Sequence, residues 1–410
     1  MSDGFDIDPA PRQETLSVRI HAGEARTHRP LNAPLYLSSQ WEAGSLDELA
    51  ELFADDPDRG FYTRFGHPTV RVAEEKIATL EGADDALLFG SGMGAISTAL
   101  YAVLEGGDHV VAHRAIFGQT IRLLEHMSGA YGVEVEFVDA TDPENVRDVL
   151  RPSTRLVYLE TPSNPLIDII DVEAVSAVAH AGDALVFTDS TFAGPLLQKP
   201  IELGADLSLQ SASKSMGGHA DLVAGSAAGS EGLIGRIREM RTLNGPSLAP
   251  HTCWLLLRGL QTLPLRVRKQ SDAARRLADR IQAHPAVSEL RYPHHECHPG
   301  YGVAKRQMRL GGGMMSFAFH RGLPATREFV QGLRWIPIAS SLGSVQTTLE
   351  VPEQLDFTSD ELGERASAFE MPPGLVRLSV GVEAYEDLEA DILSGLKAVE
   401  SRERTAASAP

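Results

Sequence analysis

Residues 209–225, LQSASKSMGGHADLVAG, contain a single lysine, Lys214, at the end of a short apolar run. Its neighbours are serines, glycines and alanines, so little side-chain bulk would cover its amine. A lysine amine whose pKa is lowered by its surroundings can form a Schiff base with a carbonyl compound. A solvated surface lysine would explain the same segment, so other residues must decide between the two interpretations.

A glycine-rich loop, FGSGMGA at residues 89–95, follows an expected strand and opens an expected helix. Such a loop presents backbone N–H groups and a helix N-terminus to an anion such as phosphate. The same residues match the G-x-G-x-x-A form of the dinucleotide fingerprint, which would indicate a dinucleotide-dependent dehydrogenase. That alternative requires an acidic residue at the end of the next strand, where this chain has His113 and Arg114.

Asp189 ends the apolar run ALVFTD, and Lys214 follows the next expected strand at 206–210. A turn or cap role would be ordinary for an aspartate at that place. Because the carboxyl ends of parallel strands meet at one sheet edge, we expect Asp189, Lys214 and the glycine loop to share a crevice. A lysine, a phosphate cradle and a buried carboxylate together indicate pyridoxal phosphate, whose ring is an electron sink when its nitrogen stays protonated. Ser211 and Ser213 would add hydroxyl donors to the phosphate.

The elements that must position these residues alternate along the chain. Apolar strands are expected at 86–89, 109–113, 134–139, 155–160, 184–189, 206–210 and 222–229, with helices between the earlier ones. This pattern predicts an α/β fold with a mostly parallel central sheet between helices. Residues 255–283 predict one or two long helices, bent or broken near Pro264, followed by a smaller α+β unit with strands at 314–319 and 375–380. We expect an N-terminal arm at 1–65, a large domain at 66–260 and a C-terminal α+β domain at 261–410.

Composition excludes several other classes of protein. The 410 residues carry a formal net charge of −19, whereas nucleic acids and anionic membranes require a basic surface. No apolar run approaches the roughly 20 residues of a membrane span, and the acidic first residues do not resemble a secretory signal. Two cysteines, Cys253 and Cys297, provide no disulfide framework, so we expect a cytoplasmic protein. The segment HHECH, residues 294–298, has metal-ligand residue types but not the spacing of a zinc site, so we expect a solvated loop and no metal.

Further segments occur in a characteristic order. They are PLYLSSQW (34–41), FYTRFGHPT (61–69), FGSGMGAI (89–96), LETPSNP (159–165), FTDSTFAGP (187–195), LLLRGLQTLPLR (255–266), SSLGSVQT (340–347) and VRLSVGVE (376–383). Together with SASKSMGGHADLVAG (211–225), they resemble the cysteine and methionine metabolism enzymes that use pyridoxal phosphate. The resemblance extends from about Leu16 to Ala398, and the family contains cystathionine γ-synthases, γ- and β-lyases, methionine γ-lyases and homoserine sulfhydrylases.

The resemblance implies the type I pyridoxal phosphate fold, which is that of aspartate aminotransferase. It implies Lys214 as the catalytic residue that bonds the cofactor and moves protons. The cofactor-binding residues that it implies are Tyr62, Arg64, Gly92, Met93, Phe117, Asp189, Ser211, Ser213 and Lys214. Asn164, Ser341 and Arg377 would bind the substrate, with the backbone near Leu342. Tyr62 and Arg64 would reach the phosphate of a neighbouring subunit, which implies shared active sites in a homotetramer of paired dimers.

One departure from the family pattern guides the expected reaction. Most members carry a tyrosine in the segment that corresponds to RAIFGQT (114–120), where this chain has Phe117. Drift would explain the change, but a phenol is dispensable when the leaving group is a carboxylate, whose conjugate acid has a pKa near 4. We therefore expect γ-replacement on an O-acyl-homoserine, with a γ-lyase of the methionine, cystathionine or canavanine type as the alternative. Gln119 and Val351 also depart from the family pattern and suggest an unusual substrate pocket.

Overall fold

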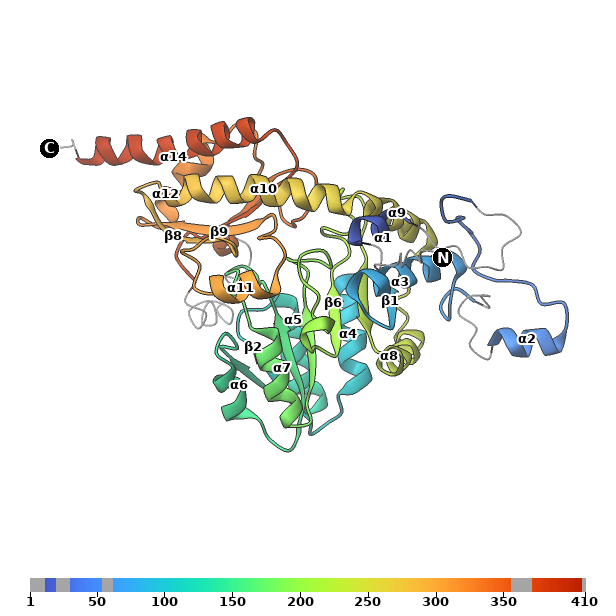
Figure 1. Cartoon of the computed structure of the whole chain (residues 1–410). Helices are drawn as coiled ribbons and strands as arrows, with labels where there is room; N and C mark the ends of the chain where they lie inside the picture. Colours follow the sequence, from blue (N-terminus) through green and yellow to red (C-terminus); the bar gives the residue numbers. More distant parts are fainter. Residues whose placement is uncertain (1–11, 20–29, 54–61, 355–370, 408–410) are drawn as a thin grey trace, which may run out of the picture.

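The computed structural model describes residues 12–19, 30–53, 62–354 and 371–407 (Figure 1). Its larger part is built on a seven-stranded sheet. The strands are β1 (Asp85–Phe89), β2 (His109–His113), β3 (Glu134–Val138), β4 (Thr154–Glu160), β5 (Leu185–Asp189), β6 (Leu207–Gln210) and β7 (Gly225–Gly229).

The strand order is β1-β7-β6-β5-β4-β2-β3, and β7 is antiparallel to both of its neighbours while the other pairs are parallel. The predicted α/β fold with a mostly parallel sheet is thus confirmed. The strand expected at 222–229 begins only at Gly225. A Cβ at Gly225 would lie 2.2 Å from the carbonyl oxygen of Ser91, so only glycine lets β7 pass this close to the glycine-rich loop.

Helices cover both faces of this sheet, because its strands are apolar on both sides. Along β4, Leu156 and Tyr158 enter one apolar cluster, and Val157 and Leu159 enter another on the opposite face. The helices of this part are α3 (Pro68–Glu81), α4 (Gly92–Val103), α5 (Gly118–Tyr131), α6 (Pro143–Val149), α7 (Val172–Ala181) and α8 (Glu231–Asn244), with a short 3₁₀ helix η1 (Ile201–Leu203).

The predicted break near Pro264 is confirmed: α9 (Pro250–Gln261) ends and α10 (Leu263–Gln282) begins around Thr262. Because α10 runs from the larger part towards the C-terminal sheet (Figure 1), we propose this junction as the domain boundary. The C-terminal sheet is antiparallel, in the order β10-β11-β9-β8. Its elements are β8 (Val287–Arg291), α11 (Tyr301–Gln307), β9 (Met314–Phe319), α12 (Leu323–Gly332), β10 (Thr348–Glu350), η2 (Pro352–Gln354), β11 (Val376–Ser379) and α14 (Tyr385–Ala407).

The N-terminal part contains two short helices, α1 (Gln13–Val18) and α2 (Leu46–Phe53). Figure 1 shows α2 reaching out from the body of the molecule, while α1 lies beside α3 and α9. Residues 1–11, 20–29 and 54–61 of the expected arm lie outside the described residues. Within the described ranges, no helix combines the length and the apolar character that crossing a bilayer requires.

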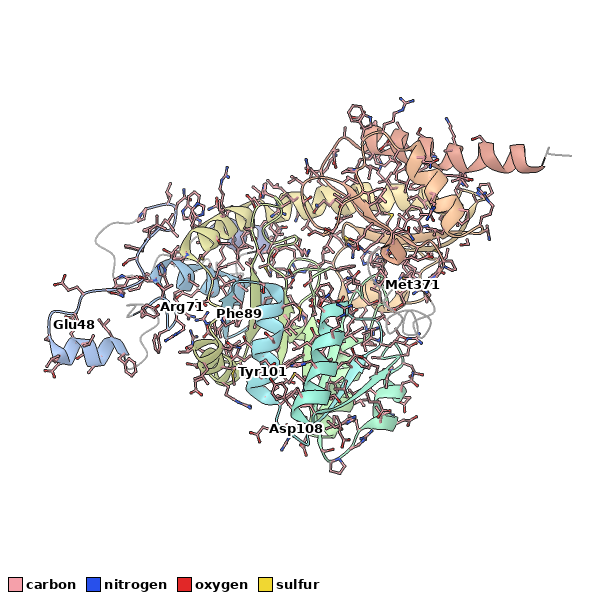
Figure 2. All side chains as sticks on the ribbon, turned by 180° about the vertical axis from the view of Figure 1, so that it is seen from behind. Glu48, Arg71, Phe89, Tyr101, Asp108 and Met371 are labelled. Carbon is pink, nitrogen blue, oxygen red and sulfur yellow. The ribbon has the colours of Figure 1, made fainter. Side chains whose placement is uncertain are left out.

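The carboxyl ends of the parallel strands face the C-terminal sheet. Asp108, directly before β2, lies at the far end of the larger part, and Met371 lies between the two parts (Figure 2). The strand β2 therefore runs from the far end towards the smaller sheet, and its parallel neighbours run the same way. The crevice predicted at this edge is consequently closed on its other side by the C-terminal part.

Candidate active site

Lys214 lies in a tight turn directly after β6. Its backbone N–H donates to the carbonyl of Ser211 at 3.0 Å, and its own carbonyl accepts from Gly218 at 2.8 Å. The half-buried side chain crosses to the C-terminal part, where Nζ donates to Oγ of Ser341 at 2.6 Å. Burial lowers the pKa of this amine, and the positive charge of Arg377 lowers it further against the opposing effect of Glu350. A larger neutral fraction makes the amine a better nucleophile and base near neutral pH.

The loop that carries Ser341 is pressed against the lysine segment. A Cβ at Gly343 would lie 2.7 Å from the backbone nitrogen of Ser215, and Gly343 has a φ of 74°. Ser341 itself has a φ of 81°, a conformation that costs a non-glycine residue free energy. The Gly343 N–H donates to Oγ of Ser379 at 2.8 Å, which ties this loop to β11. The structure thus fixes the predicted residue Ser341 beside Lys214.

Arg377 on β11 is buried and held from three sides. Its guanidinium donates to Oδ1 of Asn164 at 2.7 Å, to the carbonyl of Ser341 at 3.2 Å and to Oε2 of Glu350 at 2.5 Å. Burial lowers the pKa of Arg377 and raises that of Glu350, its cross-strand neighbour on β10. The three substrate residues expected from sequence, Asn164, Ser341 and Arg377, are therefore in contact, although they come from distant parts of the chain.

Asp189 and Glu160 are directly paired at the carboxyl ends of β5 and β4. Asp189 accepts the backbone N–H of Thr191 at 2.9 Å. Burial raises the pKa of both carboxyls, well above the usual range for Glu160, where the negative charge of Asp189 adds to the effect. The sequence-based interpretation selected Asp189 but missed Glu160. The sequence signal for Glu160 is the same as the one for Asp189, because Glu160 is an acidic residue at the end of the apolar strand that precedes TPSNP.

Glu160 links this carboxylate pair to Phe117. Its Oε2 accepts the backbone N–H of Phe117 at 2.7 Å, at the residue that precedes α5. The Phe117 side chain is 39% exposed, so its ring is not part of the apolar core. Of the two other departures from the family pattern, Gln119 is exposed on the first turn of α5, and Val351 is buried in the core of the C-terminal part.

The expected phosphate cradle lies at the start of α4. Gly92 is the first residue of that helix, followed by Met93, and Ser91 caps it by accepting the N–H of Gly94 at 2.9 Å. A Cβ at Gly92 would lie 3.0 Å from Cβ of Ser211, so the loop and the lysine segment are in close contact. The two predicted serines differ in their hydrogen bonds. Ser213 Oγ donates to the carbonyl of Ala224 at 3.1 Å and accepts the N–H of the same residue at 2.9 Å. Ser211 Oγ has no hydrogen-bond partner among the described residues.

Tyr62 and Arg64 stand apart from this cluster. Tyr62 forms an isolated bridge with Gln40 and is 38% exposed, and Arg64 lies over its ring with 5.6 Å between Cζ and the ring centroid. Among the described residues, neither Tyr62 nor Arg64 has a hydrogen bond, ion pair or ring contact with Lys214, Asp189 or Arg377. Within one chain, these two predicted residues are thus not brought to the site.

The segment 294–298 differs from the solvated loop expected. His298 is only 4% exposed and its Nε2 hydrogen-bonds the carbonyl of Ile167 at 2.9 Å, so it holds that loop to the larger part. Cys297 is exposed and hydrogen-bonds His295. The described parts of the chain contain no group of three or more His, Cys, Asp or Glu side chains arranged to hold a metal ion.

Comparison with known proteins gives concordant matches. The family model for the Cys/Met metabolism PLP-dependent enzymes matches residues 14–397. An L-methionine gamma-lyase of Treponema denticola is 37% identical over 385 residues, which are 93% of this chain and 96% of that protein. A cystathionine beta-lyase of Lactococcus lactis subsp. cremoris is 37% identical over 383 residues, 92% of this chain and 97% of that protein. The structure of cystathionine gamma synthase from Xanthomonas oryzae pv. oryzae in complex with cystathionine superposes with a TM-score of 0.89 at 34% identity and covers 96% of this chain and 100% of that one.

Proposed function

The chain belongs to the Cys/Met metabolism PLP-dependent enzyme family, and we propose that it replaces the γ-substituent of an O-acyl-homoserine or a similarly activated amino acid. Membership makes it a pyridoxal phosphate-dependent enzyme that acts on small amino acids. The identity of the γ-substituent and the choice between replacement and elimination are the new parts of the proposal.

The residues at the carboxyl edge fit the cofactor. Lys214 would bond it, Asp189 would pair with its pyridine nitrogen, and the helix start at Gly92 and Met93 would hold its phosphate together with Ser211. The free hydroxyl of Ser211 and the lack of room for a side chain at Gly92 support this assignment. When bound, the group supplies an electron sink for charge that develops on the substrate carbon atoms.

Arg377 would bind the α-carboxylate of the substrate. A guanidinium offers a planar pair of donors that matches a carboxylate. Asn164, Ser341 and Glu350 fix the orientation of this guanidinium through hydrogen bonds. Lys214 hydrogen-bonds Ser341, so the amine lies beside the proposed carboxylate site, where it would remove and return protons at the α and β carbons of the substrate.

Phe117 is the observation that carries the choice of leaving group. Its backbone is anchored to Glu160, next to Asp189, so its exposed ring lies at the same sheet edge as the proposed cofactor site. A phenyl ring can stack on a cofactor but has no proton to donate. A thiolate leaving group benefits from protonation because a thiol has a pKa near 8.5, whereas a carboxylate leaves without it. The site therefore favours an acyl ester over a thioether.

A γ-lyase is the second candidate, because several curated relatives carry the name L-methionine gamma-lyase at 36–39% identity. Elimination and replacement share the steps up to loss of the γ-substituent. In this alternative, Lys214 or Tyr62 of a neighbouring chain would protonate the departing sulfur.

We also propose that active sites are shared between subunits of a homotetramer. Among the described residues of their own chain, Tyr62 and Arg64 have no hydrogen bond, ion pair or ring contact with Lys214, Asp189 or Arg377, and both are exposed. A cationic and a phenolic side chain presented in this way suit the phosphate of a neighbouring subunit. The absence of disulfides among the two cysteines supports a cytoplasmic location as part of the same proposal.

A substrate comparison tests the reaction. Purified holoenzyme would be incubated with O-acetyl- and O-succinyl-homoserine, each with and without cysteine or sulfide, and with methionine, cystathionine and canavanine. New thioether products report replacement, and 2-oxobutanoate reports elimination. We expect the acyl-homoserines to be turned over fastest and the products with thiol present to be thioethers.

Phe117→Tyr is the matched variant for this comparison. A positioned general acid contributes about 10²- to 10⁴-fold when the leaving group needs a proton and little otherwise. The variant should therefore raise turnover of methionine and cystathionine more than turnover of the esters. Rapid thioether cleavage by the native enzyme, without a selective gain in the variant, would reject the proposal and favour the γ-lyase.

A further inference from the structure

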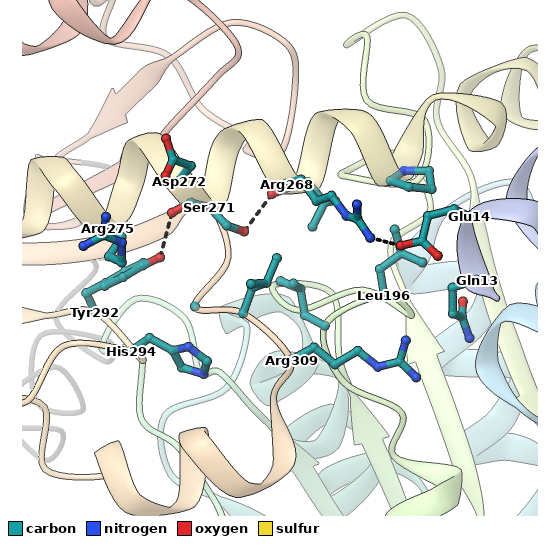
Figure 3. Close-up of a pocket in the computed structure, with 15 residues that line it drawn as sticks. Gln13, Glu14, Leu196, Arg268, Ser271, Asp272, Arg275, Tyr292, His294 and Arg309 are labelled. Carbon is teal, nitrogen blue, oxygen red and sulfur yellow. Dashed lines mark hydrogen bonds and ion pairs between the residues drawn. The ribbon is translucent and has the colours of Figure 1, made fainter.

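A cavity of about 470 Å³ lies behind the candidate active site, between α1, α10 and the segments 196–197, 292–294 and 309–311 (Figure 3). This volume is within the range of small-molecule sites. Part of its wall is apolar, formed by Leu196, Leu197, Pro264, Val267 and Leu310. The rest is polar and contains charges of both signs.

One charge in this cavity stands apart from the others. Arg268 pairs with Glu14, Arg275 lies 3.6 Å from Asp279, and Asp272 lies 4.0 Å from Arg276. Arg309, in contrast, is an exposed residue whose guanidinium has no ion-pair or hydrogen-bond partner in the part of the chain that the structure describes. Its backbone N–H donates to the carbonyl of Leu197 at 2.8 Å, which fixes the base of the side chain. Figure 3 shows the guanidinium extending along the cavity towards the side where Gln13 and Glu14 lie.

Gln13 provides a second, independent observation. Its side chain is only 7% exposed, and Nε2 donates to the carbonyl of Leu80 at 3.3 Å. Its Oε1 is buried and finds no donor among the described residues. A buried acceptor without a donor costs about 1–3 kcal/mol, so a turn of this side chain that brings Oε1 to the cavity and pairs it with a ligand N–H would remove a penalty that the protein alone carries.

We propose that this cavity is a second binding site, for a zwitterionic amino acid with an apolar side chain. The carboxylate would bind Arg309, the ammonium group would donate to Gln13 Oε1 once that side chain turns towards the cavity, and the apolar side chain of the ligand would rest on Leu197 and Val267. The unpaired cation and the unpaired acceptor are complementary to the carboxylate and the ammonium group that an α-amino acid carries on one carbon atom. An anion without a donor, such as a simple carboxylate, would satisfy only one of them.

The site is separate from the Lys214 cluster but close to it. Leu197 and Val267 also line a smaller cavity of about 20 Å³, whose other wall includes Phe192, Ser215 and Leu342. Ser215 and Leu342 are the chain neighbours of Lys214 and Ser341, so the smaller cavity is bordered by residues of both sites. The proposal goes beyond the reaction and holds for a replacement enzyme and for a lyase alike.

Calorimetric titration of the holoenzyme with L-norleucine tests it. Norleucine has no γ leaving group, so neither reaction consumes it, and its binding at the active site is followed separately by the absorbance of the cofactor. We expect each chain to bind two equivalents of norleucine, one of which leaves the cofactor absorbance unchanged. Arg309→Gln should raise the Kd for that second norleucine about 10- to 100-fold, as expected for the loss of a charged hydrogen bond. The variant should keep the absorbance change that norleucine causes at the active site.

Matched variants separate the site from general effects. Arg155→Gln removes an exposed arginine beside Asp108, at the opposite end of the sheet, and should keep two equivalents. Leu310→Trp fills the cavity without a change in charge and should also abolish binding of the second equivalent. Hexanoate, which lacks the ammonium group of norleucine, should likewise not bind as a second equivalent. The proposal is overturned if native enzyme binds one equivalent, or if the second survives both Arg309→Gln and Leu310→Trp.

Discussion

Glu81 offers a direct test of how burial tunes charge beneath the lysine segment. It is the last residue of α3 and is fully buried. Its Oε2 accepts from Oγ of Ser208 at 3.0 Å and its Oε1 from Nε2 of Gln210 at 2.8 Å, so it underlies β6, the strand that leads into Lys214. Burial raises the pKa of Glu81 to about 7, because these two hydrogen bonds and the charge of Lys199 only partly offset the loss of solvation.

The sign of the stability effect follows from proton linkage. Between pH 4.5 and about 7 the unfolded chain has lost this proton while the folded chain keeps it, so the free energy of unfolding decreases as pH rises through that interval. One pKa unit corresponds to 1.36 kcal/mol, so the full effect above pH 7 is about 3 kcal/mol. Glu81→Gln keeps the shape: its amide oxygen can accept from Nε2 of Gln210, and its amide nitrogen can donate to Oγ of Ser208, which reverses that bond. Glutamine cannot ionise, so we expect the variant to be close to neutral at low pH and stabilising at high pH.

Thermal unfolding of native and variant holoenzyme between about pH 5 and pH 8, at one scan rate, measures this difference. With an unfolding entropy of about 2.1 cal/mol/K per residue, about 3 kcal/mol corresponds to an increase in Tm of about 4 °C at pH 8, and the smaller effect at pH 5 to about 1 °C. Glu239→Gln, an exposed change on α8, should produce no such trend. A difference in Tm that is the same at every pH, or a variant that is less stable at pH 8, would refute the reasoning.

Three further predictions concern the proposed site. Borohydride reduction should fix the cofactor to the peptide that contains Lys214, and Lys214→Ala should lose both this label and at least about 10²-fold in kcat; a label on another peptide would contradict the assignment. Mixing Arg64→Ala with Lys214→Ala subunits should restore activity that neither has alone, because a hybrid dimer has one intact site; no recovery after proven subunit exchange would place each site within one chain. Arg377→Lys should raise KM about 10- to 100-fold, because one ammonium cannot replace a bidentate guanidinium, and an unchanged KM would mean that another cation binds the carboxylate.

Much of the fold could be predicted because the strands are short apolar runs bounded by glycine or polar residues. The runs at 109–113 and 314–319 became strands with the expected bounds, since strands buried on both faces are mostly apolar and therefore appear as short continuous runs. The start of β7 was misjudged because Leu222 and Val223 are apolar, although Val223 is 61% exposed and lies before the strand. Sequence pattern does not show which apolar residue remains in solvent.

The candidate site could be predicted only in part. Lys214 and Asp189 follow from their places at strand ends, whereas Asn164 and Arg377 are 213 positions apart and their contact depends on how the C-terminal sheet lies over the larger one. Glu160 and Glu350 were missed because an acidic residue near a strand end looks the same whether it is solvated or buried. Their partners, the Phe117 N–H and the Arg377 guanidinium, are supplied by tertiary structure alone.

Glu160 shows why the missed residues bear on the choice of substrate. Its carboxyl is the direct neighbour of Asp189, and its hydrogen bond to Phe117 fixes the backbone of the one aromatic residue that departs from the family pattern. The backbone position of Phe117 is therefore set by β4, the strand that pairs with β5 and its proposed cofactor partner Asp189. A tyrosine placed there would inherit the same backbone anchor, so a comparison of Phe117→Tyr with the native enzyme isolates the hydroxyl group. The comparison therefore tests whether this single oxygen atom decides between ester and thioether substrates, as the proposed function requires.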